Sequence, residues 1–278
     1  MRAILLIPVA LVLIAGCDTQ EPQPPLEGDP PDALVYVPDW RLVWSDEFNA
    51  DGAPDPSKWT YEVGRLRNQE AQYYTDARPE NARIEDGRLV IEARREAYEG
   101  ADYTSASLTT RYKASWTYGR IEVRAKLPTG RGLWPAIFTF GTRFDEIGWP
   151  RSGEIDIMEN FGFDPDRVTS SIHTLAFNHT IGTSKTASKI IAAPYDQFHV
   201  YAVEWYRNRI ITFVDGERLL VYRKLPGYGP EEWPFYDPQF LLLNVAVGGT
   251  AGGWIDESVF PQRMEVDYVR VYQEARRL

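Results

Sequence analysis

The chain has 278 residues with 40 acidic and 30 basic side chains, a formal net charge of −10 and a single cysteine. This acidic balance excludes duplex nucleic acid as a partner, because binding to phosphates requires a basic surface. One cysteine excludes an intrachain disulfide and any zinc site built on several cysteines. The aromatic residues comprise 9 Trp, 16 Tyr and 12 Phe, so the composition indicates a soluble, aromatic-rich globular protein.

The first sixteen residues predict a secretory signal peptide. Arg2 precedes an apolar run, residues 3–14, that is too short to span a bilayer as a helix. The run ends in Ile14-Ala15-Gly16-Cys17, which resembles the lipidation box of bacterial lipoproteins. We therefore expect Cys17 to carry a lipid anchor in a bacterial membrane, on the periplasmic side or the outer cell surface. The alternative is an ordinary signal peptide that contains a cysteine.

Residues 17–38 predict an extended tether rather than folded structure. Residues 18–38 contain six prolines and several acidic side chains, and they show no apolar periodicity before Leu34. Such a composition is typical of a solvated linker. We expect the folded domain to cover residues 39–278.

The pattern of this domain is strand-like throughout. Alternating or continuous apolar runs predict strands at residues 89–94, 119–126, 199–206, 210–214, 241–247 and 264–272, and Asp-Gly pairs at 86–87 and 215–216 predict tight hairpin turns. No amphipathic segment is long enough for a helix. A dozen or more short strands in about 240 residues predict an all-β fold, a large antiparallel β-sandwich.

One of these strands carries three carboxylates, in the segment Glu154-Ile155-Asp156-Ile157-Met158-Glu159. In a regular strand Glu154 and Asp156 share a face, whereas Glu159 would point into the apolar core, where a carboxylate is costly. A one-residue β-bulge near Ile157 and Met158 would return Glu159 to the face of the other two acids. The sequence therefore predicts that bulge.

Paired carboxylates on one face suit glycoside hydrolysis. Retaining enzymes use two carboxyl groups about 5–5.5 Å apart, a nucleophile and a proton donor, and repulsion between like charges keeps the donor protonated. The alternatives for such a pattern are a solvated strand face and an oxygen-rich calcium site. Trp134-Pro135 and Trp149-Pro150 flank the strand, and indole rings are common platforms for sugars, which favours the glycosidase.

The segment resembles the signature of glycoside hydrolase family 16, in its laminarinase-like branch with the extra Met. The resemblance extends over the domain through the segments 44–49, 72–75, 118–122, 127–135, 243–249 and 266–272. It implies a concanavalin A-like jelly roll with a concave substrate cleft. It also implies a retaining endo-β-1,3-glucanase that hydrolyses internal β-1,3 bonds of laminarin-like or mixed-linkage β-glucans.

The same resemblance assigns roles to the acids. It implies that Glu154 is the nucleophile, Glu159 the acid/base, and Asp156 an assisting acid between them. It further implies four substrate-binding residues: Asn68, Trp134, Trp149 and His173. The alternative interpretation of Trp134 is a core tryptophan, and that of His173 is a structural histidine.

Relatives in this family often carry a structural calcium ion far from the cleft. Glu47, Gly87 and Asp267 match the segments that supply it, largely through backbone carbonyls, and oxygen ligands suit calcium. The three histidines lack zinc-binding spacing, so we expect no cofactor for catalysis. We expect a monomer.

Two departures from the family pattern bear on the substrate. Phe138 and Thr139 stand where relatives usually have Trp-Met, and we expect them to alter one wall of the cleft. Residues 170–188 form a polar stretch that we expect to be a loop bordering it. The alternatives to a glucanase are the same chemistry on agarose, carrageenan or xyloglucan, and a non-catalytic glucan-binding lipoprotein. Two intact glutamates argue against the last, because a binder needs no matched acid pair.

Overall fold

The computed structural model describes residues 38–275. The expected signal peptide, the expected lipidation site Cys17 and the tether up to residue 37 lie outside the described residues and remain predictions. From Asp39 onward the described chain forms one compact unit.

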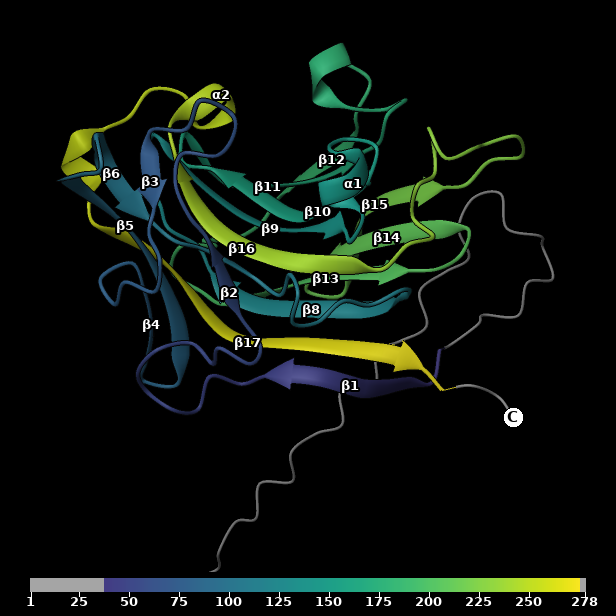
Figure 1. The fold of residues 1–278 in the computed structure, drawn as a ribbon, viewed down its shortest axis with the longest axis horizontal. Helices are drawn as coiled ribbons and strands as arrows, with labels where there is room; N and C mark the ends of the chain where they lie inside the picture. Colours follow the sequence, from purple (N-terminus) through teal and green to yellow (C-terminus); the bar gives the residue numbers. More distant parts are fainter. Residues whose placement is uncertain (1–37, 276–278) are drawn as a thin grey trace, which may run out of the picture. The chain divides into compact units, whose positions relative to one another are not determined.

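The domain is built from two β-sheets (Figure 1). The ten-stranded sheet contains β1 (Trp40–Asp46), β3 (Gln72–Tyr74), β4 (Ala82–Glu85), β5 (Arg88–Tyr98), β6 (Ala101–Ser105), β8 (Gly119–Lys126), β13 (His199–Trp205), β14 (Arg209–Val214), β15 (Glu217–Arg223) and β17 (Gln262–Glu274). The seven-stranded sheet contains β2 (Thr60–Glu62), β7 (Ser107–Thr109), β9 (Leu133–Gly141), β10 (Glu154–Phe161), β11 (Asp164–His173), β12 (Lys185–Ile190) and β16 (Gln239–Val247).

The order of strands in the seven-stranded sheet is β12-β11-β10-β9-β16-β7-β2, which places the carboxylate strand β10 between β11 and β9. Neighbouring strands of the described domain run antiparallel, except for the parallel pair β3 and β6. In Figure 1 the strands β9, β10 and β16 curve, with their concave side turned away from β8 and β17. The predicted all-β sandwich is confirmed.

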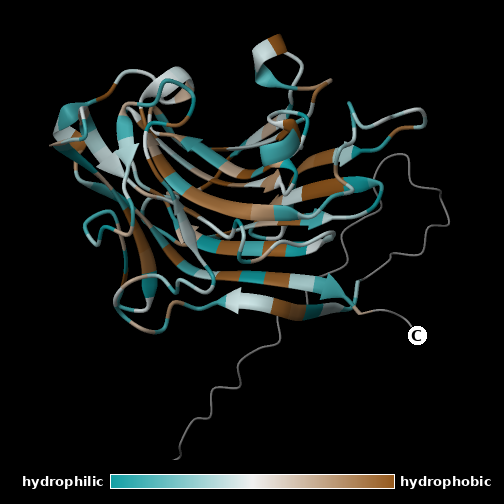
Figure 2. Cartoon of the chain, viewed as in Figure 1, coloured by the Kyte–Doolittle hydropathy of each residue, from teal (hydrophilic) through white to brown (hydrophobic). Residues whose placement is uncertain are grey.

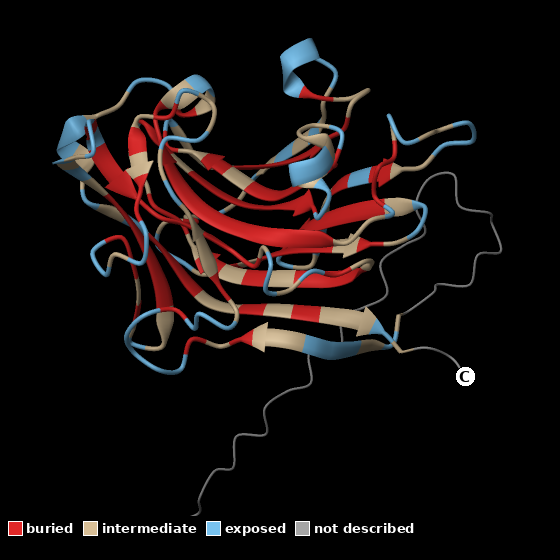
Figure 3. Ribbon diagram, viewed as in Figure 1, coloured by how far each residue is buried: buried red, intermediate tan, exposed pale blue. Residues whose placement is uncertain are grey.

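Apolar side chains fill the space between the sheets, with Trp59, Tyr201 and Trp233 among the largest. Figure 2 shows apolar residues along β16, and every residue of this strand is buried (Figure 3). A strand buried on both faces reads as a continuous apolar run, as predicted for residues 241–247. Exposed residues gather mainly in the turns, and also on β1.

The predicted hairpins are confirmed at both Asp-Gly pairs. Asp86-Gly87 joins β4 to β5, and Asp215-Gly216 joins β14 to β15. All four residues have positive φ angles, between 51° and 78°. This geometry matches the twist of the flanking strands and explains the preference for Asp-Gly.

The helices are short: α1 (Phe144–Ile147), α2 (Gly249–Gly252), and the 3₁₀ turns η1 (His179–Ile181) and η2 (Glu257–Val259). Within residues 38–275, no helix has the length and apolar character needed to cross a membrane. The expected loop at residues 170–188 is wrong at both ends, because β11 continues to His173 and β12 begins at Lys185. Ser170 and Ser171 are buried strand residues, and the hydroxyl of Ser170 donates to the carbonyl oxygen of Asp156.

Candidate active site

The predicted bulge lies in the middle of β10. Asp156 pairs with Phe138 of β9, but the next pair joins Met158 to Ile137, so β10 contains one extra residue. The pairing with β11 shifts in the same interval. Ile157 and Met158 are both in the core between the sheets. Two consecutive core residues bring Glu159 to the face that bears Glu154 and Asp156, which we call the catalytic face.

The nucleophile candidate Glu154 is held by an indole. Trp149, from the loop that follows α1, donates its Nε1 proton to Glu154 Oε2 over 2.5 Å. The other side of this indole meets imidazole rings. Its centroid lies 5.0 Å from that of His179 in η1 and 6.1 Å from that of His173.

A second indole holds the acid/base candidate. Trp134 of β9 donates its Nε1 proton to Glu159 Oε1 over 3.0 Å. Trp134 and Glu159 lie on neighbouring strands, because Glu159 pairs with Ala136. The ring of Trp134 packs against Phe161, with centroids 5.9 Å apart. Each glutamate thus accepts one charge-assisted hydrogen bond from a tryptophan.

Asp156 lies between these two glutamates and pairs with a histidine. His173, the last residue of β11, is opposite Glu154 in the sheet, and its Nε2 lies 3.1 Å from Asp156 Oδ2. Both side chains are almost completely buried. Hydrogen bonding to Glu154 lowers the pKa of Asp156, against the larger raising effects of burial and of Glu159.

Burial raises the pKa of all three acids. For Glu154 the charge of Asp156 adds to the effect of burial, while His173 and the indole of Trp149 oppose it, and the net pKa is well above the usual value. Burial and the charge of Glu159 raise the pKa of Asp156. Burial also raises the pKa of Glu159, against the effects of His173, Trp134 and Ser171. Three carboxylates cannot all ionise in one buried site, so the group retains a proton near neutral pH.

The ligand atoms of Glu154, Asp156 and His173 lie within 4.8 Å of one another, a spacing that could also hold a metal ion. Each of these groups already has a protein partner: the indole of Trp149 for Glu154, and the Asp156–His173 pair for the other two. The third acid, Glu159, has its own indole donor. The arrangement therefore fits acid and nucleophile chemistry better than metal coordination.

Asn68 lies beside the catalytic face in a polar network. It has a left-handed φ of 54°, and its Nδ2 donates to the buried Glu70 over 3.2 Å. Glu70 accepts a second bond from Tyr74, whose hydroxyl accepts from Asn244 of β16. Asn244 pairs in turn with Ala136, the residue opposite the acid/base. The network thus connects Asn68 to the catalytic face through β16.

Phe138 and Thr139, which depart from the family pattern, do not both line the cleft wall as expected. Thr139 is buried and bonds to Gln239 Oε1 over 3.0 Å, and it pairs with the core residue Ile155. It does not line the catalytic face, because alternation turns it toward the core. Phe138 does lie on that face but is covered, with the guanidinium of Arg67 5.4 Å above its ring.

The expected calcium segments lie on neighbouring strands of the other sheet. β17 carries Asp267 and pairs with both β1, which Glu47 follows, and β5, which Gly87 precedes. Both carboxylates are engaged: Arg270 bonds to both oxygens of Glu47, and Arg124 to Oδ2 of Asp267. Side chains already paired with arginine do not fit a cation, whereas backbone carbonyls of these segments suit calcium.

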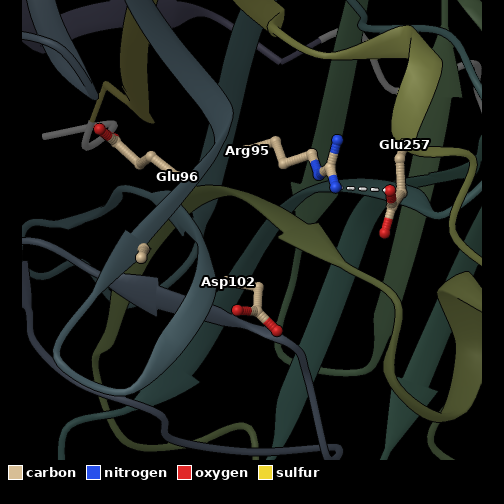
Figure 4. Close-up of a pocket in the computed structure, with 5 residues that line it drawn as sticks. Arg95, Glu96, Asp102 and Glu257 are labelled. Carbon is tan, nitrogen blue, oxygen red and sulfur yellow. Dashed lines mark ion pairs between the residues drawn. The ribbon is translucent and has the colours of Figure 1, made fainter.

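A pocket of about 430 Å³ lies away from β10 and is lined by Arg95, Glu96, Ala97, Asp102 and Glu257 (Figure 4). An ion pair of 2.7 Å joins Arg95 to Glu257 across it. None of its lining residues is aromatic or belongs to the carboxylate strand. This pocket is therefore not the site of the chemistry.

Comparison with known proteins identifies the family. The model of glycosyl hydrolases family 16 matches residues 69–270. The chain belongs to glycosyl hydrolase family 16. A β-glucanase of Rhodothermus marinus is 51% identical over 250 residues, which cover 85% of this chain and 86% of the relative.

Solved structures of family 16 proteins share the fold. The X-ray structure of the laminarinase from Rhodothermus marinus has a TM-score of 0.84 at 50% identity and covers 86% of this chain and 100% of that chain. A mutant of SCLam, a non-specific endo-β-1,3(4)-glucanase co-crystallized with an oligosaccharide, has a TM-score of 0.82 at 46% identity, covering 85% of this chain and 95% of that chain. The protein is a glycoside hydrolase with a jelly-roll fold.

Within this family 16 site, sequence reasoning missed two features. Trp149 and Trp134 were expected only as platforms for sugars, and their hydrogen bonds to Glu154 and Glu159 were not predicted. His179 was noted only as part of a polar stretch, although its ring contacts both Trp149 and His173. No local pattern indicates this contact, because η1 follows β11 and Trp149 precedes β10.

Proposed function

We propose that the protein is a retaining endo-β-1,3-glucanase that hydrolyses internal β-1,3 bonds of laminarin-like or mixed-linkage β-glucans. The observation that carries this proposal is the bulged strand β10, which presents two glutamates on one face, each held by an indole donor. The laminarinase and the endo-β-1,3(4)-glucanase among its relatives support the choice of linkage.

The reaction proceeds in two displacements. Glu154 attacks the anomeric carbon, and the bond to the departing sugar breaks as Glu159 gives its proton to the glycosidic oxygen. Glu159, now ionised, then takes a proton from water, which attacks the same carbon. The bond to Glu154 breaks and the sugar leaves with its original configuration.

Asp156 and His173 support the nucleophile in this scheme. The Trp149 donor orients the Glu154 carboxylate, and the His173 partner fixes the neighbouring Asp156. A fixed nucleophile reacts faster because its orientation has already been set. The Trp149 donor lowers the pKa of Glu154 against the effect of burial, which favours the ionised form that attacks.

The test is a substrate panel of laminarin, barley β-glucan, agarose, carrageenan and xyloglucan with the purified domain. We expect reducing ends from laminarin, and from barley glucan at internal bonds, with none from Glu154→Gln. Binding of laminarin without hydrolysis by the wild type would instead identify a glucan-binding protein. Cleavage confined to one of the other three polysaccharides would overturn the linkage assignment while leaving the reaction class.

We also propose that the protein is a monomer tethered to a bacterial membrane by acylation of Cys17, a residue outside the described part of the chain. The support is the sequence that precedes this cysteine. Expression with a radiolabelled fatty acid should label the wild type and not Cys17→Ala. Light scattering of the domain without its first 38 residues should give the monomer mass.

We further propose one structural calcium ion, held mainly by backbone carbonyls near Glu47, Gly87 and Asp267. The support is the meeting of these three segments around β17. Ligand binding to the folded state raises stability, so calcium should raise the melting temperature relative to a chelator. An unchanged melting temperature would contradict this site without affecting the proposed activity.

A further inference from the structure

Three aromatic rings form a row on the acid/base side of the site. Trp134 packs against Phe161 with a centroid distance of 5.9 Å, and Phe161 stacks on Phe163 at 5.7 Å with an angle of 11° between the planes. Both distances lie in the usual range of aromatic pairs. Trp134 and Phe161 are partly buried, and Phe163 is 49% exposed. We call these three residues the aromatic strip.

The aromatic strip is continuous with the catalytic machinery. Its first ring belongs to the tryptophan that bonds to Glu159, and Phe161 follows Glu159 by two positions on β10. A single exposed Phe is common on protein surfaces and requires no explanation. Phe163 differs from such a residue, because it stacks on a row of rings that ends at the tryptophan bonded to Glu159.

The turn that carries Phe163 is braced. Gly162 donates its backbone N–H to Leu133 of β9, and a side chain at this glycine would collide with the carbonyl oxygen of Gly130. The side chain of Asn160 donates to the carbonyl oxygens of both Pro165 and Arg167 across the hairpin. Because the turn is held in place, its ring is available to a ligand at a low entropic cost.

The chemistry indicates which part of the glucan meets this strip. In a retaining displacement the departing oxygen leaves on the side opposite the nucleophile, within reach of the acid/base. Glu154 begins β10 and Glu159 lies near its other end. The departing sugar is attached to the oxygen that Glu159 protonates, so the chain continues past Glu159 toward Phe161 and Phe163.

We propose that the aromatic strip of Trp134, Phe161 and Phe163 binds the glucose units on the leaving-group side of the cleaved bond. This inference rests on the proposed retaining mechanism. The flat rings offer apolar surfaces to the C–H faces of glucose, and Phe163 is the outermost of them. It is therefore a binding residue for long substrates and has no part in the bond-making steps.

The first experiment compares two substrates that share a mechanism. Laminarihexaose has a long leaving group, whereas the leaving group of 4-nitrophenyl β-laminaribioside is a single 4-nitrophenol, which we expect to be too short to reach Phe163. In Phe163→Ala we expect kcat/KM for laminarihexaose to fall about fivefold to tenfold, with the aryl glycoside unchanged within about twofold. Phe163→Tyr keeps the ring and should restore the wild-type value. Leu42→Ala, an exposed apolar residue on β1 of the other sheet, is the control and should change neither rate.

Equal loss on both substrates, or no loss on either, would overturn the inference while leaving the hydrolase activity established. A second measurement does not need turnover: calorimetric binding of laminarihexaose to Glu154→Gln and to Glu154→Gln/Phe163→Ala. We expect the double variant to bind about fivefold more weakly. Equal dissociation constants, or no binding by either protein, would overturn the proposed role of the aromatic strip. Failure of the wild type to cleave any β-1,3-glucan would refute the proposed function, and the binding pair would still decide this inference.

Discussion

The glutamates near the two ends of the carboxylate strand each accept a hydrogen bond from a tryptophan, but the rings packed against the two tryptophans differ. Trp149 bonds to Glu154 and Trp134 bonds to Glu159. Behind Trp149 stand the imidazoles of His173 and His179, whereas behind Trp134 stands the phenyl ring of Phe161. One indole is therefore supported by titratable groups and the other by an apolar ring.

The two glutamates have different tasks in the proposed mechanism. The nucleophile must be ionised before the reaction begins, and His173 and the indole of Trp149 lower the pKa of Glu154 against the larger effect of burial. The acid/base must hold a proton first, and burial raises the pKa of Glu159 against the effects of His173, Trp134 and Ser171. His173 and a tryptophan donor thus act in the same direction on both glutamates, so the different rings behind the two indoles do not by themselves set the two protonation states.

The largest difference between the two ends should come from removing each acid. Glu154→Ala should lower kcat about 10⁴-fold on any substrate, because the covalent intermediate is lost. Glu159→Ala should lower it about 10²- to 10⁴-fold on laminarin, but far less for the first step on a 2,4-dinitrophenyl glycoside, whose leaving group needs no proton. Burst kinetics on both substrates measures this. Equal losses of the two variants on the aryl glycoside would contradict the assignment of roles.

Removing each indole donor should move opposite limbs of the pH profile. A hydrogen bond to a charged group is worth about 1.5–3 kcal/mol, so Trp149→Phe and Trp134→Phe should each lower kcat/KM about 10- to 100-fold. Each donor lowers the pKa of its glutamate, so its loss raises that pKa. The acidic limb of Trp149→Phe should then move to higher pH, and so should the basic limb of Trp134→Phe. Movement of the same limb in both variants would count against two separate functions.

Replacing His179 tests whether its contact with Trp149 contributes to activity. An aromatic contact contributes about 0.5–1.5 kcal/mol, so His179→Ala should lower kcat/KM by up to about tenfold with little change in melting temperature. Ile181, an exposed residue of the same η1 turn, provides the matched control, and Ile181→Ala should retain full activity. Equal effects of both variants would indicate that the loop is merely disturbed.

The smallest expected effect is on stability. Since the folded state raises the pKa of Glu154, the ionised carboxylate destabilises the fold as the pH rises above the pKa of the unfolded chain. Glu154→Gln should therefore be more stable than the wild type at pH 7.5, and the gain should vanish about a unit below the pKa of the unfolded carboxyl, where both states bind the proton. Thermal unfolding at the two pH values measures this. A larger gain in stability for Glu159→Gln than for Glu154→Gln would contradict this prediction.

Much of this site could be predicted because it depends on alternation along one strand. Three carboxylates separated by Ile, Ile and Met cannot share a face without a bulge, and the cost of burying Glu159 decided the matter. The Asp-Gly hairpins were predictable for a similar reason, since few other residues adopt two successive positive φ angles. Each is a local rule with a large energetic penalty.

The features that could not be predicted depend on contacts between distant segments. Thr139 was expected to alter a wall of the cleft because it departs from the family pattern. β9 is buried on both faces, and such a strand shows no alternation that would separate its core side from its catalytic side. Ser170 and Ser171 were expected in a loop because polar residues rarely fill a buried strand, yet the hydroxyl of Ser170 bonds to the carbonyl oxygen of Asp156 and that of Ser171 to Thr186 of β12. The contact of His179 with Trp149 joins two loops, and no periodicity describes it.

The bulge in β10 also protects the fold against misalignment of its strands. If β10 slipped by one residue against β9 or β11, its carboxylates would enter the apolar interior and its isoleucines would meet water. Such pairings are unstable from the moment they form, so the correct alignment is selected while the sheet assembles. The acids to which we assign the reaction therefore also mark the alignment of the strand that carries them.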